Sequence, residues 1–204
     1  MVTVRFPEIM RRNGHERGAA MVEMAIVAPL MILLVFSILE YGLLFQEKLT
    51  VASAVTSAAR TGATMGTRAE ADLAILQALE AGLYDQVDTS VIIQADIFKA
   101  DTNTGAKTGT LNRYTYVTTN VGCKWSPCPD PSAGPVTYGI PSAWGDPADR
   151  DTELDPGGGG LDVLGVEITY HHSAVTSFIP GVERDFTERA LVRLEPSTFE
   201  SSGG

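Results

Sequence analysis

The fold of this chain is decided by a stretch near its amino terminus, RGAAMVEMAIVAPLMILLVFSIL (residues 17–39). A basic leader ends at Gly18, and the apolar block behind it carries one carboxylate, Glu23. No side chain from Met24 to Leu39 is charged, and with the residues before Glu23 the block reaches the roughly 20 residues that cross a bilayer core of about 30 Å. We therefore expect a membrane-spanning helix over residues 19–45, with Glu23 inside the apolar block; the alternative is that Glu23 merely lies among the lipid headgroups.

Charge predicts how this helix is oriented. The leader, residues 1–18, contains four arginines and two glutamates and so carries +2; because the whole chain carries −10, the rest carries −12. Positively charged flanks stay in the cytoplasm. We therefore expect a single-pass cell membrane protein with a cytoplasmic amino terminus and an extracytoplasmic carboxy-terminal domain.

An ordinary secretory signal is the main alternative for the amino end. Basic residues, an apolar core and the small residues Ala52-Ser53-Ala54 resemble its three-part pattern. However, the apolar block is longer than the usual core of about 7 to 15 residues, and charged residues such as Glu40 and Glu47 intervene before the small residues. The pattern favours a retained helix; a signal cut here would leave Val55 as the first residue.

The helical pattern continues beyond the span to about Gly66. Small residues recur there at spacings of three and four, which predicts a stripe that packs closely against its own domain or, in addition, a sister helix. The stripe consists of Val51, Ala52, Val55, Ala58, Ala59, Gly62, Ala63 and Gly66.

A second helix and a sheet follow. The spacing of Thr67 and Glu70 is that of a capping box, and the apolar pattern behind it ends near Gly82 to Asp85. Alternating residues then predict about four strands. These lie near residues 91–98, 114–119, 164–170 and 186–194. The class is α+β, with an antiparallel sheet covering the outer half of the first helix.

The expected organisation has five parts: the leader 1–18, the transmembrane helix 19–45, an exported helical part 46–85, a sheet part 86–196 with a long loop over 120–160, and a flexible tail 197–204.

The long loop is rich in proline and glycine and holds the only two cysteines, Cys123 and Cys128. Exported domains lie in an oxidising compartment, so we expect a disulfide between them in preference to free thiols. Zinc is disfavoured because His171 and His172 are adjacent in a strand and point to opposite faces, one buried and one solvated.

Acidic residues of the loop form a weak calcium candidate, since carboxylates near glycine supply the oxygen ligands that Ca²⁺ prefers. They are Asp149, Asp151, Glu153 and Asp155, next to Asp146. A solvated acidic loop is the preferred interpretation, because Leu154 stands where an EF-hand needs glycine. The aromatic residues Trp125, Tyr138, Trp144 and Phe178 are expected to anchor loops.

Composition and motifs argue against two function classes. The sequence has no phosphate-binding loop, no G-x-S-x-G elbow and no H-E-x-x-H helix, so we expect no enzyme and no cofactor. The acidic outer domain disfavours nucleic acid as a partner.

The pattern over residues 17–30 resembles the TadE-like minor pilins, or pseudopilins, of tight-adherence (Flp, type IVb) pilus systems. Residues 39–42 (LEYG) and 189–196 (RALVRLEP) reinforce the resemblance, and the expected helix-and-sheet plan is pilin-like. It implies that a prepilin peptidase cuts after Gly18, leaving Ala19 as the new amino terminus. One departure is Met24, where many relatives have an aromatic residue.

The same resemblance implies how the mature protein assembles. Glu23, the fifth mature residue, would pair with the terminal amine of a neighbouring subunit, and Pro29 belongs to the same assembly segment. The expected partners are the peptidase, other pilins and minor pilins, the inner-membrane pilus assembly machinery and membrane lipid. The expected function is a minor pilin precursor in an adhesive pilus; the alternative is a permanently anchored binding module that uses the loop 120–160.

Overall fold

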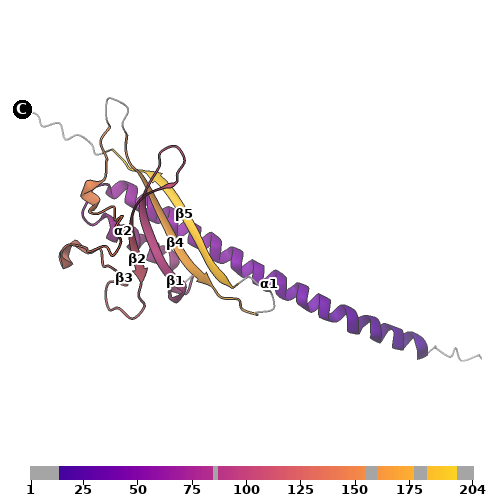
Figure 1. Cartoon of the computed structure of the whole chain (residues 1–204). Coiled ribbons are helices and arrows are strands. Elements are labelled where there is room, and N and C mark those ends of the chain that lie inside the picture. The colour runs from indigo at the N-terminus through magenta and orange to yellow at the C-terminus, as the bar shows by residue number, and fades with distance from the viewer. Residues whose placement is uncertain (1–13, 85–86, 155–159, 177–182, 197–204) are drawn as a thin grey trace, which may run out of the picture.

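A long amino-terminal helix carries a small α+β domain on its distal half (Figure 1). The computed structural model describes residues 14–84, 87–154, 160–176 and 183–196. Helix α1, Gly14–Met65, has 52 residues and contains Pro29, which gives a length of about 78 Å at about 1.5 Å per residue. This agrees with the single unbroken helix expected up to about Gly66, while most of the leader and the tail 197–204 lie outside the described residues.

The junction between the two helices differs from the expected capping box. Gly66 adopts a left-handed conformation with φ of 56° and ends α1, after which backbone bonds from Arg68 to Met65 and from Ala71 to Arg68 form successive turns. Helix α2 spans Ala71–Leu83, and its N-cap is Glu70, whose side chain makes no capping hydrogen bond. The capping-box prediction is therefore wrong, because the chain needs these turns to reverse before α2 begins; the expected end of α2 is confirmed.

One antiparallel sheet packs against both helices. Its strands have the order β3-β2-β1-β4-β5. The strands are β1 Ile92–Ala100, β2 Lys107–Tyr116, β3 Trp125–Ser126, β4 Val163–His172 and β5 Arg184–Arg193, and the short 3₁₀ helices are η1 Thr89–Val91, η2 Pro131–Ala133 and η3 Pro147–Asp149. The α+β class is confirmed. The sheet has a fifth strand, β3, which the sequence pattern did not predict because two residues are too few to show alternation.

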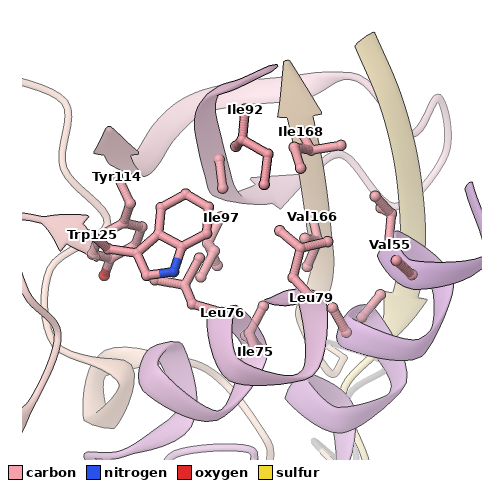
Figure 2. Packing of buried hydrophobic residues seen from close by; sticks show 14 of the residues in the cluster. Val55, Ile75, Leu76, Leu79, Ile92, Ile97, Tyr114, Trp125, Val166 and Ile168 are labelled. Carbon is pink, nitrogen blue, oxygen red and sulfur yellow. The ribbon is translucent and has the colours of Figure 1, made fainter. Parts of the chain in front are cut away.

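The core lies between the sheet and the two helices. Figure 2 shows Ile75 and Leu79 of α2 in one cluster with Val166 of β4. The small-residue stripe of α1 enters this core: a methyl group added at Gly62 would lie 2.4 Å from Leu164 Cδ2. The stripe therefore packs against its own domain, as expected. Its buried members include Val51, Val55, Ala58, Ala59 and Ala63.

The outer face of the sheet has its own buried groups. Asp96 is almost fully buried and accepts hydrogen bonds from Arg113 Nε at 2.8 Å and from Lys107 Nζ at 3.0 Å. Burial by itself raises the pKa of Asp96, but these two cations lower it below its usual value overall. Phe98 is also buried on this face, and it lies over Gly165, where a Cβ atom would come within 2.2 Å of the ring.

Candidate functional site

The amino-terminal half of α1 stands clear of the domain (Figure 1). The helix is long and apolar enough to cross a membrane, and no residue of its qualifying 18-residue stretch is buried by the rest of the chain. Large side chains on all its sides are exposed, among them Met21, Leu30 and Ile38. Such a continuous apolar surface is unfavourable in water, so α1 is a candidate membrane span.

The residues expected to act in processing and assembly all lie in this exposed segment. Gly18, Ala19, Glu23 and Pro29 belong to α1 and are exposed. A side chain built at Gly18 would meet nothing within 4 Å. Ala19 and Glu23 are four positions apart, so they share one helix face about 6 Å apart along the axis. An amine at Ala19 and the carboxylate of Glu23 would therefore both be open to a neighbouring molecule.

A second group of polar contacts, which the sequence did not reveal, fastens α1 to the domain. Glu40 is buried, and its carboxylate accepts hydrogen bonds from the Val175 backbone N–H at 2.6 Å and the Thr176 backbone N–H at 3.1 Å. The Thr176 hydroxyl donates a third bond at 2.9 Å. Glu40 is thus satisfied by the segment that follows β4.

Two further pairs lie beyond Glu40 along the helix. Glu47 contacts His172 Nδ1, and Lys48 lies 3.5 Å from Glu188 of β5. His172 is buried and His171 is half exposed, as the alternation of the strand predicted. These contacts join α1 to β4 and β5 near the place where the helix leaves the domain.

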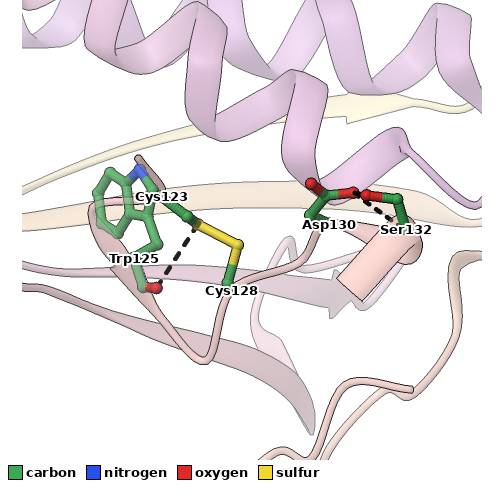
Figure 3. Close-up of a disulfide and its surroundings, with 5 residues drawn as sticks. All are labelled: Cys123, Trp125, Cys128, Asp130 and Ser132. Atoms are coloured by element: carbon green, nitrogen blue, oxygen red, sulfur yellow. Dashed lines mark hydrogen bonds between the residues drawn. A yellow bond between two sulfur atoms is a disulfide. The ribbon is translucent and has the colours of Figure 1, made fainter. Parts of the chain in front are cut away.

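The segment expected as a long loop is folded onto the domain in its described part. Cys123 and Cys128 form the expected disulfide, and the Cys123 sulfur lies 3.7 Å from the carbonyl oxygen of Trp125 (Figure 3). Trp125 is buried, its ring 4.9 Å from that of Tyr116. Figure 3 also shows Asp130 accepting from Ser132 at the start of η2.

A buried ion pair fastens the far end of the same segment to α2. Arg150 pairs with Asp72, and their side chains are 0% and 1% exposed. Asn112 Nδ2 at 2.9 Å and the Tyr114 hydroxyl at 2.5 Å also donate to Asp72. Burial, together with the charge of Asp72, raises the pKa of Tyr114, so its hydroxyl keeps its proton and donates. Trp144 packs against Arg150, whose Cζ lies 4.7 Å from the ring centroid.

Of the four aromatic residues expected to anchor loops, three lie in the described part of the chain. Trp125 and Trp144 are buried loop anchors, and the Tyr138 ring lies 6.0 Å from that of Tyr114. Phe178 lies outside the described residues.

The acidic residues form no metal site in the described part of the chain. No group of three or more His, Cys, Asp or Glu side chains there is arranged to hold a metal ion. Asp151 instead accepts from the Glu153 backbone at 3.0 Å, and Asp146 caps η3 through Ala148. Asp155 lies outside the described residues.

Comparison with known proteins connects the chain to one family. Residues 18–60 match the sequence model of the family described as TadE-like protein. No curated protein and no solved structure matches the chain. The match begins at Gly18 and covers the exposed apolar helix, Glu23, Pro29 and much of the small-residue stripe. The resemblance is thereby confirmed for this part of the molecule: residues 18–60 are similar to the TadE-like family, and they include most of the candidate membrane span.

Proposed function

We propose that the protein is the precursor of a minor pilin, or pseudopilin, of a tight-adherence pilus. In this proposal a prepilin peptidase cuts after Gly18, and the mature chain, beginning at Ala19, takes part in pilus assembly. The observation that carries the proposal is the TadE-like match, which starts at this glycine and covers a long, exposed apolar helix. The role is structural and involves no catalysed reaction.

Glu23 provides the physical reason for coupling cleavage to assembly. An unpaired carboxylate within an apolar span costs on the order of a few kcal/mol. Cleavage creates a positive amine at Ala19, and pairing this amine with Glu23 of an adjoining molecule would neutralise both charges. Both positions are exposed on the same helix face, which supports such a pairing.

Orientation and partners follow from the same proposal. The basic leader would remain in the cytoplasm, where the peptidase acts, and the acidic domain would lie outside. The partners would be the peptidase, other pilins and minor pilins, the inner-membrane assembly machinery and membrane lipid.

The cleavage step is tested by replacing Gly18 with valine in the full-length chain expressed with its pilus system. The expected result is that the precursor accumulates at its full mass. Gly42→Val is the matched control, because Gly42 lies in the same helix with open space around it and should be processed normally. Normal processing of Gly18→Val would contradict the proposed cleavage site.

The assembly step is tested by Glu23→Gln, which preserves size and removes the charge. The expected result is normal cleavage together with loss of the protein, or of pili, from the sheared surface fraction. The matched control is Glu16→Gln, because Glu16 lies in the leader and would be removed by cleavage. Unchanged piliation with Glu23→Gln would contradict the role of this carboxylate.

One observation favours the alternative, a permanently anchored binding module. A cavity of about 390 Å³ lies against α2, lined by Pro131, Pro135 and Tyr138 of the loop and by Asp72 of α2. A volume of this size suits a small ligand. An intact leader on protein that is retained in membranes would favour this function over pilus assembly.

A further inference from the structure

We propose that residues 173–176, the segment after β4, rest on the outer surface of the bilayer, that Val175 enters the lipid interface, and that the lipid-embedded part of α1 ends at Glu40. This inference rests on insertion of α1 into a membrane, and it is independent of cleavage and of pilus assembly. It also moves the end of the span from the expected residue 45 to Glu40.

Glu40 identifies the level of the boundary. Its carboxylate is buried, and it accepts three hydrogen bonds from Val175 and Thr176. These donors belong to an irregular segment after the end of β4. Irregular backbone does not lie exposed to hydrocarbon, because its unpaired polar groups would have no water to bind. The segment at Glu40 must therefore lie at, or outside, the edge of the hydrocarbon core.

The length of the helix agrees with this boundary. Residues 19–39 form 21 helical residues, which at about 1.5 Å each span about 31 Å, close to the roughly 30 Å of a bilayer core. A span that continued to residue 45 would measure about 40 Å and would place Glu40 and its loop in the hydrocarbon. The polar contacts Glu47–His172 and Lys48–Glu188 lie beyond Glu40 on the side of the domain.

The surface at this level is suited to lipid. A cavity of about 370 Å³ lies between α1 and the segment, and its lining, which includes Leu39, Leu43 and Val175, is almost entirely apolar. Val175 exposes 71% of its surface although its backbone N–H is fixed on Glu40. This cavity continues the exposed apolar surface of α1, which in a bilayer is covered by acyl chains. A lipid acyl chain of the outer leaflet is therefore the occupant that we propose.

Site-directed spin labelling of the full chain in vesicles of phosphatidylethanolamine and phosphatidylglycerol tests this contact. The native cysteines are paired with each other, so a single introduced cysteine can be labelled. Labels at Val175→Cys, Ile32→Cys and Ser53→Cys are compared by their collision rates with dissolved oxygen and with a water-soluble nickel chelate. Ile32 lies within the span, and Ser53 is exposed on α1 about 20 Å beyond Glu40 along the axis.

The expected result is that the label at Val175 loses nickel collisions and gains oxygen collisions relative to Ser53. Equal nickel access at Val175 and Ser53, with Ile32 protected, overturns the interface contact and leaves the membrane span intact. Nickel access at Ile32 overturns the span and the contact together. Protection at Val175 that disappears when the protein is diluted with lipid overturns the lipid occupant and indicates a second copy of the chain.

A charge-removing variant tests the role of Glu40 separately. Glu40→Gln is expected to raise both the mobility and the nickel access of the label at Val175, because the carboxylate no longer holds the backbone N–H groups. Glu153→Gln is the matched control, since Glu153 is exposed and distant in the sequence. Identical spectra for the two variants would overturn the assignment of the boundary to Glu40.

Discussion

Replacing Asp72 with asparagine is expected to destabilise the exported domain by about 3–5 kcal/mol, because it leaves a buried guanidinium without its counter-charge. Arg150 is 0% exposed and pairs with Asp72. Its Nε and Nη1 have no hydrogen-bond partner among the described residues, so no second hydrogen-bonded acceptor offsets the loss of the carboxylate charge. A loss of this size multiplies the ratio of unfolded to folded protein by roughly a hundred to a few thousand.

The assay is urea unfolding of the full chain in detergent micelles, followed by tryptophan fluorescence. Trp144 is a direct reporter, because the guanidinium Cζ of Arg150 lies 4.7 Å from its ring centroid, whereas Trp125, in β3, reports on the core. Asp130→Asn is the matched control: Asp130 is an N-cap that accepts from the Ser132 backbone at 2.9 Å. Asparagine is about as good an N-cap as aspartate, so this substitution should cost less than about 1 kcal/mol.

A double variant separates the charge effect from the loss of a contact. Asp72→Asn combined with Arg150→Met buries no charge, so it is expected to be more stable than Asp72→Asn alone. The reasoning is refuted if the free energy of unfolding of Asp72→Asn lies within about 1 kcal/mol of that of Asp130→Asn. It is also refuted if the stability lost by the double variant equals the sum of the losses in Asp72→Asn and Arg150→Met.

Two further predictions concern the outer face of the sheet. Gly165→Ala should cost about 1–3 kcal/mol in urea unfolding, because its Cβ would lie 2.2 Å from the Phe98 ring; Gly139→Ala, which has open space, should be nearly neutral, and equal losses would contradict the close contact. Burial alone raises the pKa of Asp96, but partners such as Arg113 lower it overall. The ionised Asp96 therefore stabilises the fold above the usual pKa of 3.8, and this stabilisation is lost as the pH falls through the lower pKa of the folded state. The free energies of unfolding of wild type and Asp96→Asn should therefore differ most near neutral pH and converge in acid. A difference that does not change with pH would contradict this.

Elements with their own periodicity could be predicted from the sequence. The apolar block and the small-residue stripe predicted α1, and alternation predicted β1, β4 and β5 to within a few residues. For β2 it predicted residues 114–119, whereas the strand is Lys107–Tyr116, so the prediction overlaps only its last three residues. Strand β3 has two residues, Trp125 and Ser126, and exists only because it pairs with β2. The prediction of a capping box at Thr67 was wrong because the chain reverses direction there, with Gly66 in a left-handed conformation, before α2 begins.

The candidate site divides in the same way. The TadE-like match from Gly18 onward was predictable because its pattern is contiguous in the sequence. The roles of Gly18, Ala19 and Glu23 in processing and assembly stay predictions. Glu40 was not, since its partner Val175 is 135 positions away. The pair of Asp72 and Arg150 is likewise separated by 78 positions. The available signal for Glu40 was a lone acid at the end of an apolar run, which marks a charge that requires a partner.

The intact mass of the mature protein, isolated from membranes or pili of a cell with its pilus system, tests the central claim most directly. The account predicts a chain that begins at Ala19, with the leader absent. A chain that retains its leader, or one that begins at Val55 after loss of the whole apolar helix, would contradict it.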